Sequence, residues 1–148
     1  MQISEEMIRS LVEKVLTEAP SAAAPAGSGS AFPKQKDPSG VIGVHTSMVP
    51  LEPFQGRDDV RLRDIATLEE APRIGSGVME LTNGADFEWT LTYDEWDVVL
   101  EGRLEIVIDG RTVGADAGGV IYIPRGSRIH FTTPDHAKFV YTVFPADW

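Results

Sequence analysis

The first segment of the chain, Ile3 to Ala19, has the apolar pattern of an amphipathic helix. Ser4 is suited to cap its first turn, and Glu6 lies where the helix dipole favours negative charge. Large apolar side chains recur at helical spacing until Pro20 ends the pattern. They are Met7, Ile8, Leu11, Val12, Val15 and Leu16. We therefore expect Met1 to Ala19 to hold one short helix with a single apolar stripe.

Residues 20–40 read PSAAAPAGSGSAFPKQKDPSG, a composition too poor in large apolar residues to form a core. We expect a flexible linker here, which tethers the helix to the rest of the chain. A short amphipathic helix is marginal alone in water, so its stripe needs a partner. Two interpretations are open: the helix packs on its own domain or a second subunit, or it docks on another protein. The length of the linker favours docking, and a membrane-surface helix is the weakest interpretation.

From Val41 onward the pattern changes to short apolar runs separated by turn residues, which predicts β-strands. The runs are GSGVMEL, FEWTLTY, WDVVL, RLEIVID, GGVIYI, SRIHFTT and KFVYTVF. The turn signals are Asn83-Gly84, Glu101-Gly102, Asp109-Gly110, Gly118-Gly119 and Pro124-Arg125-Gly126. Such strands indicate an antiparallel sandwich or barrel, so residues 41–148 are expected to form one all-β domain. The pattern over Val60 to Leu68 is also compatible with a short helical turn.

Composition narrows the classes of function. The 148 residues contain no cysteine, which excludes a disulfide framework, a thiolate metal site and a cysteine nucleophile. The formal net charge of −10 disfavours binding to nucleic acid or to an anionic membrane. No apolar run approaches the ~18 residues of a membrane span, and charged residues interrupt the N-terminal apolar positions, unlike a secretory signal. We therefore expect a cytoplasmic protein that binds neither nucleic acid nor membrane.

Two stretches resemble the sequence motifs of the cupin superfamily, whose members are small jelly-roll barrels. Glu95 leads through WDVVLEG to Gly102, and the run GGVIYIPRG ends at Gly126. Gly84 fits the glycine that opens the first motif, and Glu95 falls where the superfamily has a metal-binding glutamate. The resemblance implies a cupin jelly-roll barrel, preceded here by the N-terminal helix and its linker.

The histidines of the cupin motifs are missing from their places. The run WTLT of residues 89–92 occupies the positions in the first motif, and Ile129 occupies the position in the second. His130 comes one residue later, and a one-residue offset turns a strand side chain to the opposite face. Glu95 alone does not hold a transition metal, so we expect no tightly bound Zn, Fe or Mn.

Strand alternation predicts which side chains replace the metal site. If Glu95 faces the interior, as the resemblance implies, Asp97 and Val99 face it too. The side chains that then face outward, toward a dimer interface or a covering segment, are Trp96, Val98 and Leu100. On the preceding strand we expect Glu88, Thr90 and Thr92 to face the interior, opposite Phe87, Trp89 and Leu91. Tyr93 and Tyr122 are aromatic candidates for the same interior.

Glu95 and Asp97 are the strongest candidate site residues. Two carboxylates in one partly buried pocket raise a pKa or recruit a cation, and oxygen-only ligands suit Mg²⁺ or Ca²⁺. The alternative is that both carboxylates pair with arginines and are structural. Tyr93 is a third candidate catalytic residue, and its alternative is a core aromatic whose hydroxyl contacts a carboxylate.

Arg125 and Arg128 flank a Pro-Gly turn and are candidates for binding an anion such as a phosphate or a carboxylate. Their alternative is a plain surface position. His45 and His136 are interpreted as a solvated loop residue and a turn residue.

Three runs, FEWTLTYDEWDVVLEGRLEI, VIYIPRGSRIHF and VYTVFPADW, together resemble the EutQ-type ethanolamine-utilisation proteins, a branch of the cupins. The similarity covers about Val41 to Trp148. The helix on a Pro/Ala-rich linker also resembles the encapsulation peptides of bacterial microcompartment cargo.

The EutQ resemblance implies a cupin barrel without the usual metal site, often a homodimer, associated with the ethanolamine microcompartment in the cytoplasm. It also implies an acetate kinase activity that interconverts acetyl phosphate plus ADP and acetate plus ATP. Under this reading Glu95 and Asp97 bind Mg²⁺, and Arg125 and Arg128 contact the phosphates of ATP. The alternative is a non-catalytic assembly protein whose residues Met1 to Ala19 dock on microcompartment shell or cargo proteins.

Overall fold

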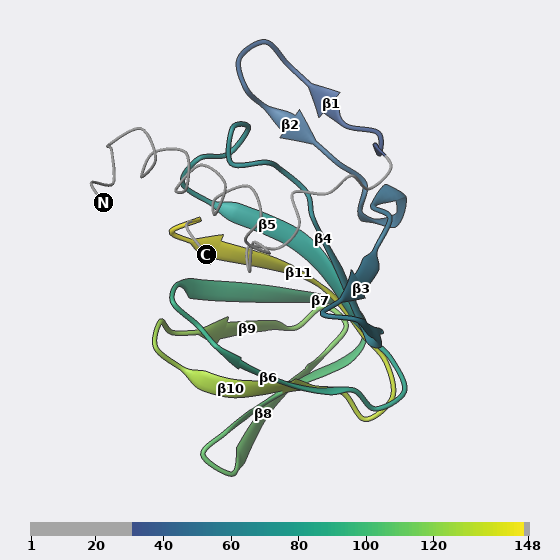
Figure 1. Ribbon diagram of the computed structural model, residues 1–148, viewed down its shortest axis with the longest axis vertical. Helices are drawn as coiled ribbons and strands as arrows, with labels where there is room; N and C mark the ends of the chain where they lie inside the picture. Colours follow the sequence, from purple (N-terminus) through teal and green to yellow (C-terminus); the bar gives the residue numbers. More distant parts are fainter. Residues whose placement is uncertain (1–30, 147–148) are drawn as a thin grey trace, which may run out of the picture.

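The computed structural model describes residues 31–146, and these build a curled antiparallel β-structure (Figure 1). The expected helix at Met1 to Ala19 and the first part of the expected linker lie outside the described residues. Within 31–146 the helical structure is a single 3-10 turn, η1 (Thr46–Met48). No helix in this part of the chain is long and apolar enough to span a bilayer.

Most of the strands follow one another through short turns. The strands are β1 (Gln35–Lys36), β2 (Ile42–Gly43), β3 (Glu52–Phe54), β4 (Arg57–Asp64), β5 (Gly75–Leu81), β6 (Asp86–Thr90), β7 (Asp94–Ile108), β8 (Arg111–Asp116), β9 (Val120–Ile123), β10 (Arg128–Thr132) and β11 (Ala137–Phe144). Residues 65–74 make a longer connection between β4 and β5. The large sheet runs β3-β4-β5-β11-β7-β10-β6, and β8 and β9 also pair with β7. All of these pairings are antiparallel. Figure 1 shows the sheet folded over on itself, with β5 and β11 in one layer and β6, β10 and β8 in the other.

The long strand β7 makes the corner between the two layers. Its first half pairs with β11 and β9, and its second half pairs with β8 and β10. Gly102 lies at the junction with φ +70, and a Cβ there would come 1.9 Å from the His136 carbonyl oxygen. Glycine is therefore needed for the close approach as well as for the backbone angle. The inward positions shift across this junction, from Val99 in the first half to Leu104 and Ile106 in the second.

The barrel core is built by strand alternation, because inward apolar side chains on each strand leave water together. Residues from β4 to β11 contribute to one buried cluster, in which Phe131 and Phe139 are among the largest fully buried side chains. Phe87, Phe131 and Phe139 lie in a row of stacked rings, with centroids 6.1 and 6.0 Å apart.

Each of the seven apolar runs overlaps a strand, so the predicted all-β architecture is confirmed. The runs WDVVL and RLEIVID join into the single strand β7, because Glu101-Gly102 is a corner rather than a reversal. The helical turn considered within Val60 to Leu68 is wrong. Val60 to Asp64 complete β4 and pair with β5, which gives their backbone groups hydrogen-bond partners in the sheet.

The segment before the barrel is partly ordered against it. β1 and β2 form a hairpin, so the linker boundary expected at residue 40 falls between two paired strands. Lys34 and Lys36 both form ion pairs with Glu70, the former at 2.9 Å. The Phe32 ring lies 5.4 Å from the Arg63 guanidinium carbon. The described end of the linker is thus held on the domain by charge and by a cation–π contact.

Candidate active site

The first half of β7 carries two carboxyl groups into the barrel. Glu95 and Asp97 are 3% and 0% exposed, and Val99 beside them is equally buried. Trp96, on the opposite face of the same strand, is 52% exposed. The alternation predicted for β7 is therefore confirmed, with the carboxylates inside and the apolar side chains outside.

Each of the two buried carboxyl groups affects the ionisation of the other. Neither Asp97 oxygen has a hydrogen-bond donor among the described residues, and an ionised carboxylate only accepts hydrogen bonds. A contact between Glu95 and Asp97 therefore becomes a hydrogen bond when one of them is protonated. Burial raises the pKa of Glu95 to about 7, opposed by its contact with Asp97. Burial, and then the charge of Glu95, raise the pKa of Asp97 well above its ordinary value. The pair thus retains a proton near neutral pH.

A third carboxyl group joins this interior from β4. The Tyr141 hydroxyl donates a 2.6 Å hydrogen bond to Asp64 Oδ1. In the sheet, Tyr141 is the register partner of both Asp97 and Gly77, and Gly77 is the partner of Asp64. A Cβ on Gly77 would lie 2.0 Å from the Tyr141 hydroxyl oxygen. The Tyr141 ring therefore crosses β5 over Gly77 to reach Asp64.

Two buried phenols complete the cluster. The Trp89 indole donates a 2.9 Å hydrogen bond to the Tyr93 hydroxyl oxygen. Burial, followed by the charge of Glu95, raises the pKa of Tyr93, and burial with the charge of Asp64 raises that of Tyr141 well above its ordinary value. Both phenols stay protonated at neutral pH, so they present hydroxyl donors rather than charges.

Three carboxyl groups and two phenols thus share the barrel interior, a donor set made of oxygen. We call Asp64, Tyr93, Glu95, Asp97 and Tyr141 the interior acid cluster. Its chemistry suits a cation, because a cation favours the ionised form of buried carboxylates and fills their hydrogen-bonding capacity.

The cluster sits in a chain whose sequence matches a known family. The model for "Ethanolamine utilisation protein EutQ" matches residues 3–148, nearly the whole length. This chain belongs to the EutQ family.

Curated relatives agree with this assignment. A Clostridioides difficile protein named acetate kinase EutQ is 40% identical over 152 residues, which cover 99% of this chain and 94% of that protein. A Salmonella typhimurium protein of the same name is 38% identical over 149 residues. That match covers 99% of this chain and 64% of the Salmonella protein, which is therefore longer.

Solved structures show the fold of the family. The Clostridium difficile EutQ protein matches with a TM-score of 0.73 at 44% identity, over 79% of this chain and 97% of that one. A putative ethanolamine utilization protein Q from Salmonella typhimurium matches with a TM-score of 0.74 at 39% identity, over 79% and 96%. The cupin domain of Schizosaccharomyces pombe Cnp3, 20% identical, matches with a TM-score of 0.59 over 70% and 73%. The last similarity concerns the fold alone, and it confirms the cupin jelly-roll.

In this EutQ-family barrel, strand β6 presents the face opposite to the predicted one. Glu88, Thr90 and Thr92 are exposed, whereas Phe87 and Leu91 are buried. The prediction of an interior polar face on this strand is wrong, because burying its apolar side chains is more favourable than burying a glutamate without a partner. Tyr122 is also outside, 47% exposed, with its ring 5.0 Å from that of Trp96.

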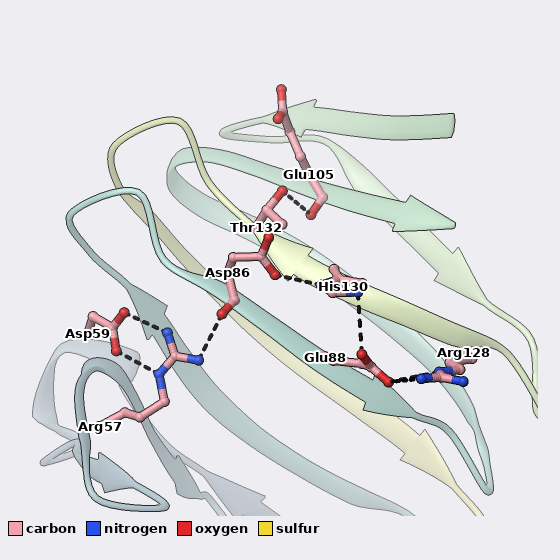
Figure 2. Close-up of polar contacts among 8 residues, drawn as sticks. All are labelled: Arg57, Asp59, Asp86, Glu88, Glu105, Arg128, His130 and Thr132. Atoms are coloured by element: carbon pink, nitrogen blue, oxygen red, sulfur yellow. Dashed lines mark hydrogen bonds and ion pairs between the residues drawn. The ribbon is translucent and has the colours of Figure 1, made fainter. Parts of the chain in front are cut away.

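The two candidate arginines do not lie together with the interior acid cluster. Arg128 is on the outer face of β10, where its Nη2 lies 2.6 Å from Glu88 (Figure 2). Arg125 is exposed in the turn after β9, and its backbone N–H donates to Asp94 Oδ1 at 2.8 Å. Asp94 directly precedes Glu95, so Arg125 lies at the end of the barrel where β7 begins.

The three histidines are outside the barrel core. His130 faces outward beside buried Ile129, as the one-residue offset predicts, and its Nδ1 lies 2.6 Å from Asp86 (Figure 2). His45 is exposed and precedes η1, where its ring accepts from the Ser47 backbone. His136 lies in the turn before β11.

Sequence reasoning missed Asp64, Tyr141 and Gly77. Asp64 lies an even number of residues from buried Val60, and Tyr141 lies an even number from buried Phe139. Strand alternation could therefore have predicted that both side chains point inward. The contact between Asp64 and Tyr141 could not be predicted in this way, because it depends on pairing between strands far apart in sequence.

Proposed function

We propose that this EutQ-family protein is a Mg²⁺-dependent acetate kinase. The phosphoryl group of acetyl phosphate passes to the terminal phosphate oxygen of ADP, and acetate and ATP are the products. The proposal rests on one observation above all: Asp97 is 0% exposed and neither of its oxygens has a donor among the described residues. A buried carboxylate without a donor is costly unless a proton or a cation meets it.

The interior acid cluster fits Mg²⁺ in the chemistry of its donors. Mg²⁺ prefers oxygen ligands and is commonly held by one or two carboxylates together with substrate phosphates. Glu95 and Asp97 are the residues that would hold it. When bound, the ion supplies positive charge to the transferring phosphoryl group. Without a cation, the carboxylates of this interior would repel a phosphate.

The remaining residues take supporting roles in the proposal. The protonated phenol of Tyr93 lies near Glu95 and presents a hydroxyl group to the site without adding charge. Tyr141 holds Asp64 by its 2.6 Å hydrogen bond. Arg125, at the end of the barrel where β7 begins, is the arginine best placed to contact a phosphate of ATP. Arg128 is already engaged by Glu88, which makes it the weaker of the two.

The test is formation of acetyl phosphate from acetate, ATP and Mg²⁺, trapped as the hydroxamate. Glu95→Gln and Asp97→Asn should each lower the rate by on the order of a hundredfold, as expected when electrostatic stabilisation of the transition state is lost. Glu105→Gln is the matched control, because Glu105 lies on the same strand and pairs with Arg103 outside the core.

The control should keep the activity of the unmodified protein. Activity that survives both interior substitutions, or that separates from the protein on a second column, would contradict the proposal. Loss of activity in Glu105→Gln as well would show that the assay reports stability rather than the site.

We also propose an assembly role, supported by an apolar surface on the outer face of β7, β9 and β11. Trp96 pairs in register with Tyr122, and Val98 pairs with Val120. The members of this surface are all at least 36% exposed: Trp96, Val98, Leu100, Val120, Tyr122 and Phe144. Exposed apolar side chains grouped in this way mark an interaction site, and a two-fold axis through it would pair it with itself in a homodimer.

Association with the ethanolamine microcompartment belongs to the same proposal, with Met1 to Ala19 docking on a shell or cargo protein. Trp96→Glu should give a folded monomer by light scattering coupled to gel filtration. Deleting residues 1–19 should leave the dimer intact and abolish co-purification with shell proteins. A dimer that survives Trp96→Glu would contradict the proposed homodimer interface. A truncated chain that still co-purifies with shell proteins would contradict the proposed docking by residues 1–19.

A further inference from the structure

A second group of metal-ligating side chains lies outside the barrel, away from the interior acid cluster. Glu80, Glu101 and His136 each place one ligand atom so that all three atoms lie within 4.8 Å of one another. The His136 Nε2 lies 2.9 Å from Glu80 Oε2. We propose that these residues bind a divalent transition-metal ion of the Zn²⁺ class.

The backbone brings the three residues together independently of their side chains. Lys138 on β11 is the register partner of both Glu80 on β5 and Glu101 on β7. The two glutamates therefore flank one residue of the central strand, across three paired strands. Side chains on neighbouring strands of one face lie about 5 Å apart, close enough for long side chains to meet over the middle strand.

Gly102 fixes His136 beside this pair. The Arg103 N–H donates a 2.9 Å hydrogen bond to the His136 carbonyl oxygen. A Cβ at Gly102 would come 1.9 Å from that oxygen, so the corner of β7 is pressed against the turn that carries the histidine. The backbone that carries the His136 imidazole is therefore held next to Glu101.

The donor set indicates the class of ion. One imidazole nitrogen with two carboxylate oxygens suits Zn²⁺ and its neighbours in the transition series, whereas Mg²⁺ and Ca²⁺ prefer oxygen alone. Three protein ligands leave positions for water. Glu80 and His136 are about one quarter to one third exposed, at 27% and 33% of their side chains, so an ion can reach them from solvent.

The histidine at this position differs from the other two in the chain. His130 also has two carboxylates nearby, but they meet opposite ring nitrogens: Asp86 lies 2.6 Å from Nδ1 and Glu88 lies 3.6 Å from Nε2. A single ion cannot use both nitrogens of one ring. His45 contacts Ser47 instead. His136 is thus the histidine whose single nitrogen converges with two carboxylates.

Lys138 is the group that opposes cation binding, because its register position is between the two glutamates. A positive charge at this position would offset part of their charge and would compete with the ion. Removing this charge while keeping a polar side chain should therefore strengthen binding.

Calorimetric titration of the full chain with Zn²⁺ tests the proposal. The unmodified protein should show a Zn²⁺ binding event whose affinity His136→Asn, Glu80→Gln and Glu101→Gln each weaken at least about tenfold. His130→Asn and Glu105→Gln are the controls, and both should bind as the unmodified protein does. Lys138→Gln should bind several-fold more tightly.

A stability readout keeps the test valid if a variant folds poorly. Zn²⁺ should raise the Tm of the unmodified protein and of His130→Asn, and leave that of His136→Asn unchanged. Binding that His136→Asn leaves intact, or that Lys138→Gln does not strengthen, would overturn the proposal. Binding that Glu95→Gln abolishes and His136→Asn keeps would also overturn it, because the ion would then occupy the interior acid cluster.

Discussion

The two halves of β7 follow opposite rules. In the second half, Leu104 and Ile106 are buried in the core while Arg103 and Glu105 form an ion pair outside, the usual arrangement of a half-buried strand. In the first half the arrangement is reversed, with Glu95 and Asp97 buried and Trp96 52% exposed.

This difference separates the part of the strand that stabilises the barrel from the part that is suited to bind. A reversed half costs free energy twice, because it buries charge and exposes apolar surface. Such a cost is expected where the inner face meets a ligand and the outer face meets a partner. The corner at Gly102 is the point at which one rule replaces the other.

The largest effect should come from shortening a core side chain in the second half of β7. Leu104 is fully buried, so Leu104→Ala should lower the free energy of unfolding by about 2–5 kcal/mol through lost burial and an empty space. Leu100→Ala, at an outward position of the reversed half, should cost about 1 kcal/mol or less. Urea denaturation measures both, and equal losses would contradict the comparison.

The buried carboxyl groups in the first half of β7 should make the free energy of unfolding depend on pH. The folded pKa of Glu95, about 7, is above its unfolded value of 4.5, so the folded state holds the proton more tightly. The free energy of unfolding should therefore fall as pH rises from about 4.5 through about 7, by roughly 3 kcal/mol at about 1.4 kcal/mol per pKa unit. Burial and the charge of Glu95 raise the pKa of Asp97 as well, so its ionisation lowers stability in the same direction.

The matched variants isolate this contribution. Glu95→Gln should lose most of the fall and be more stable than the unmodified protein at about pH 8, because no buried charge forms there. Glu105→Gln, on the outer face of the same strand, should keep it. Denaturation of the three proteins across the pH range gives the comparison, and parallel curves for all three would show that Glu95 ionises as in water.

The bridge between Tyr141 and Asp64 should break when the gap over Gly77 is filled. Gly77→Ala places a Cβ 2.0 Å from the Tyr141 hydroxyl oxygen and should cost about 1–3 kcal/mol through overpacking. Gly43→Ala is the control, because nothing lies closer than 3.4 Å to its Cβ, and its effect should stay within about 0.5 kcal/mol. A Gly77→Ala protein as stable as the control would place the Tyr141 ring elsewhere.

The smallest effect compares two tyrosines inside and outside the barrel. Tyr141→Phe removes the 2.6 Å hydrogen bond to Asp64 and should cost about 1–2 kcal/mol, because Asp64 then loses a donor in a half-buried position. Tyr122→Phe removes a 3.0 Å hydrogen bond to Asp94 at the surface, where water replaces the donor. Its cost should be within about 0.5 kcal/mol, and a reversed order in thermal unfolding would contradict this ranking.

Local patterns in the sequence predicted the strands and the inward face of β7. Alternation placed Asp97 and Val99 on the same face as Glu95, because a strand shows a period of two whatever surrounds it, and the cupin resemblance placed that face inside. The same reasoning failed on β6, where a polar interior was expected and the apolar side chains Phe87 and Leu91 are inside. The burial of large apolar side chains therefore determines which face of a strand points inward. The polar residues on the neighbouring strand have a weaker influence.

The rest of the candidate site depends on pairing that local patterns do not specify. Asp64 and Tyr141 meet because β4, β5 and β11 pair in one register and because Gly77 leaves space between them. The placement of Arg128 is similarly non-local, since its partner Glu88 is 40 residues away in the chain. In the sequence Arg125 and Arg128 lie on either side of one turn, but in the structure Arg128 points outward from β10 because side chains alternate along the strand.

The most direct test of the central claim is a ¹³C NMR titration of the Glu95 carboxyl group with and without Mg²⁺, assigned by the signal that Glu95→Gln loses. Without Mg²⁺, the pKa should be about 7, as burial beside Asp97 requires. Saturating Mg²⁺ should lower it, because a cation on Glu95 and Asp97 favours the ionised form. A pKa near 4.5, or one that Mg²⁺ leaves unchanged, would contradict the claim that this buried pair is a cation site.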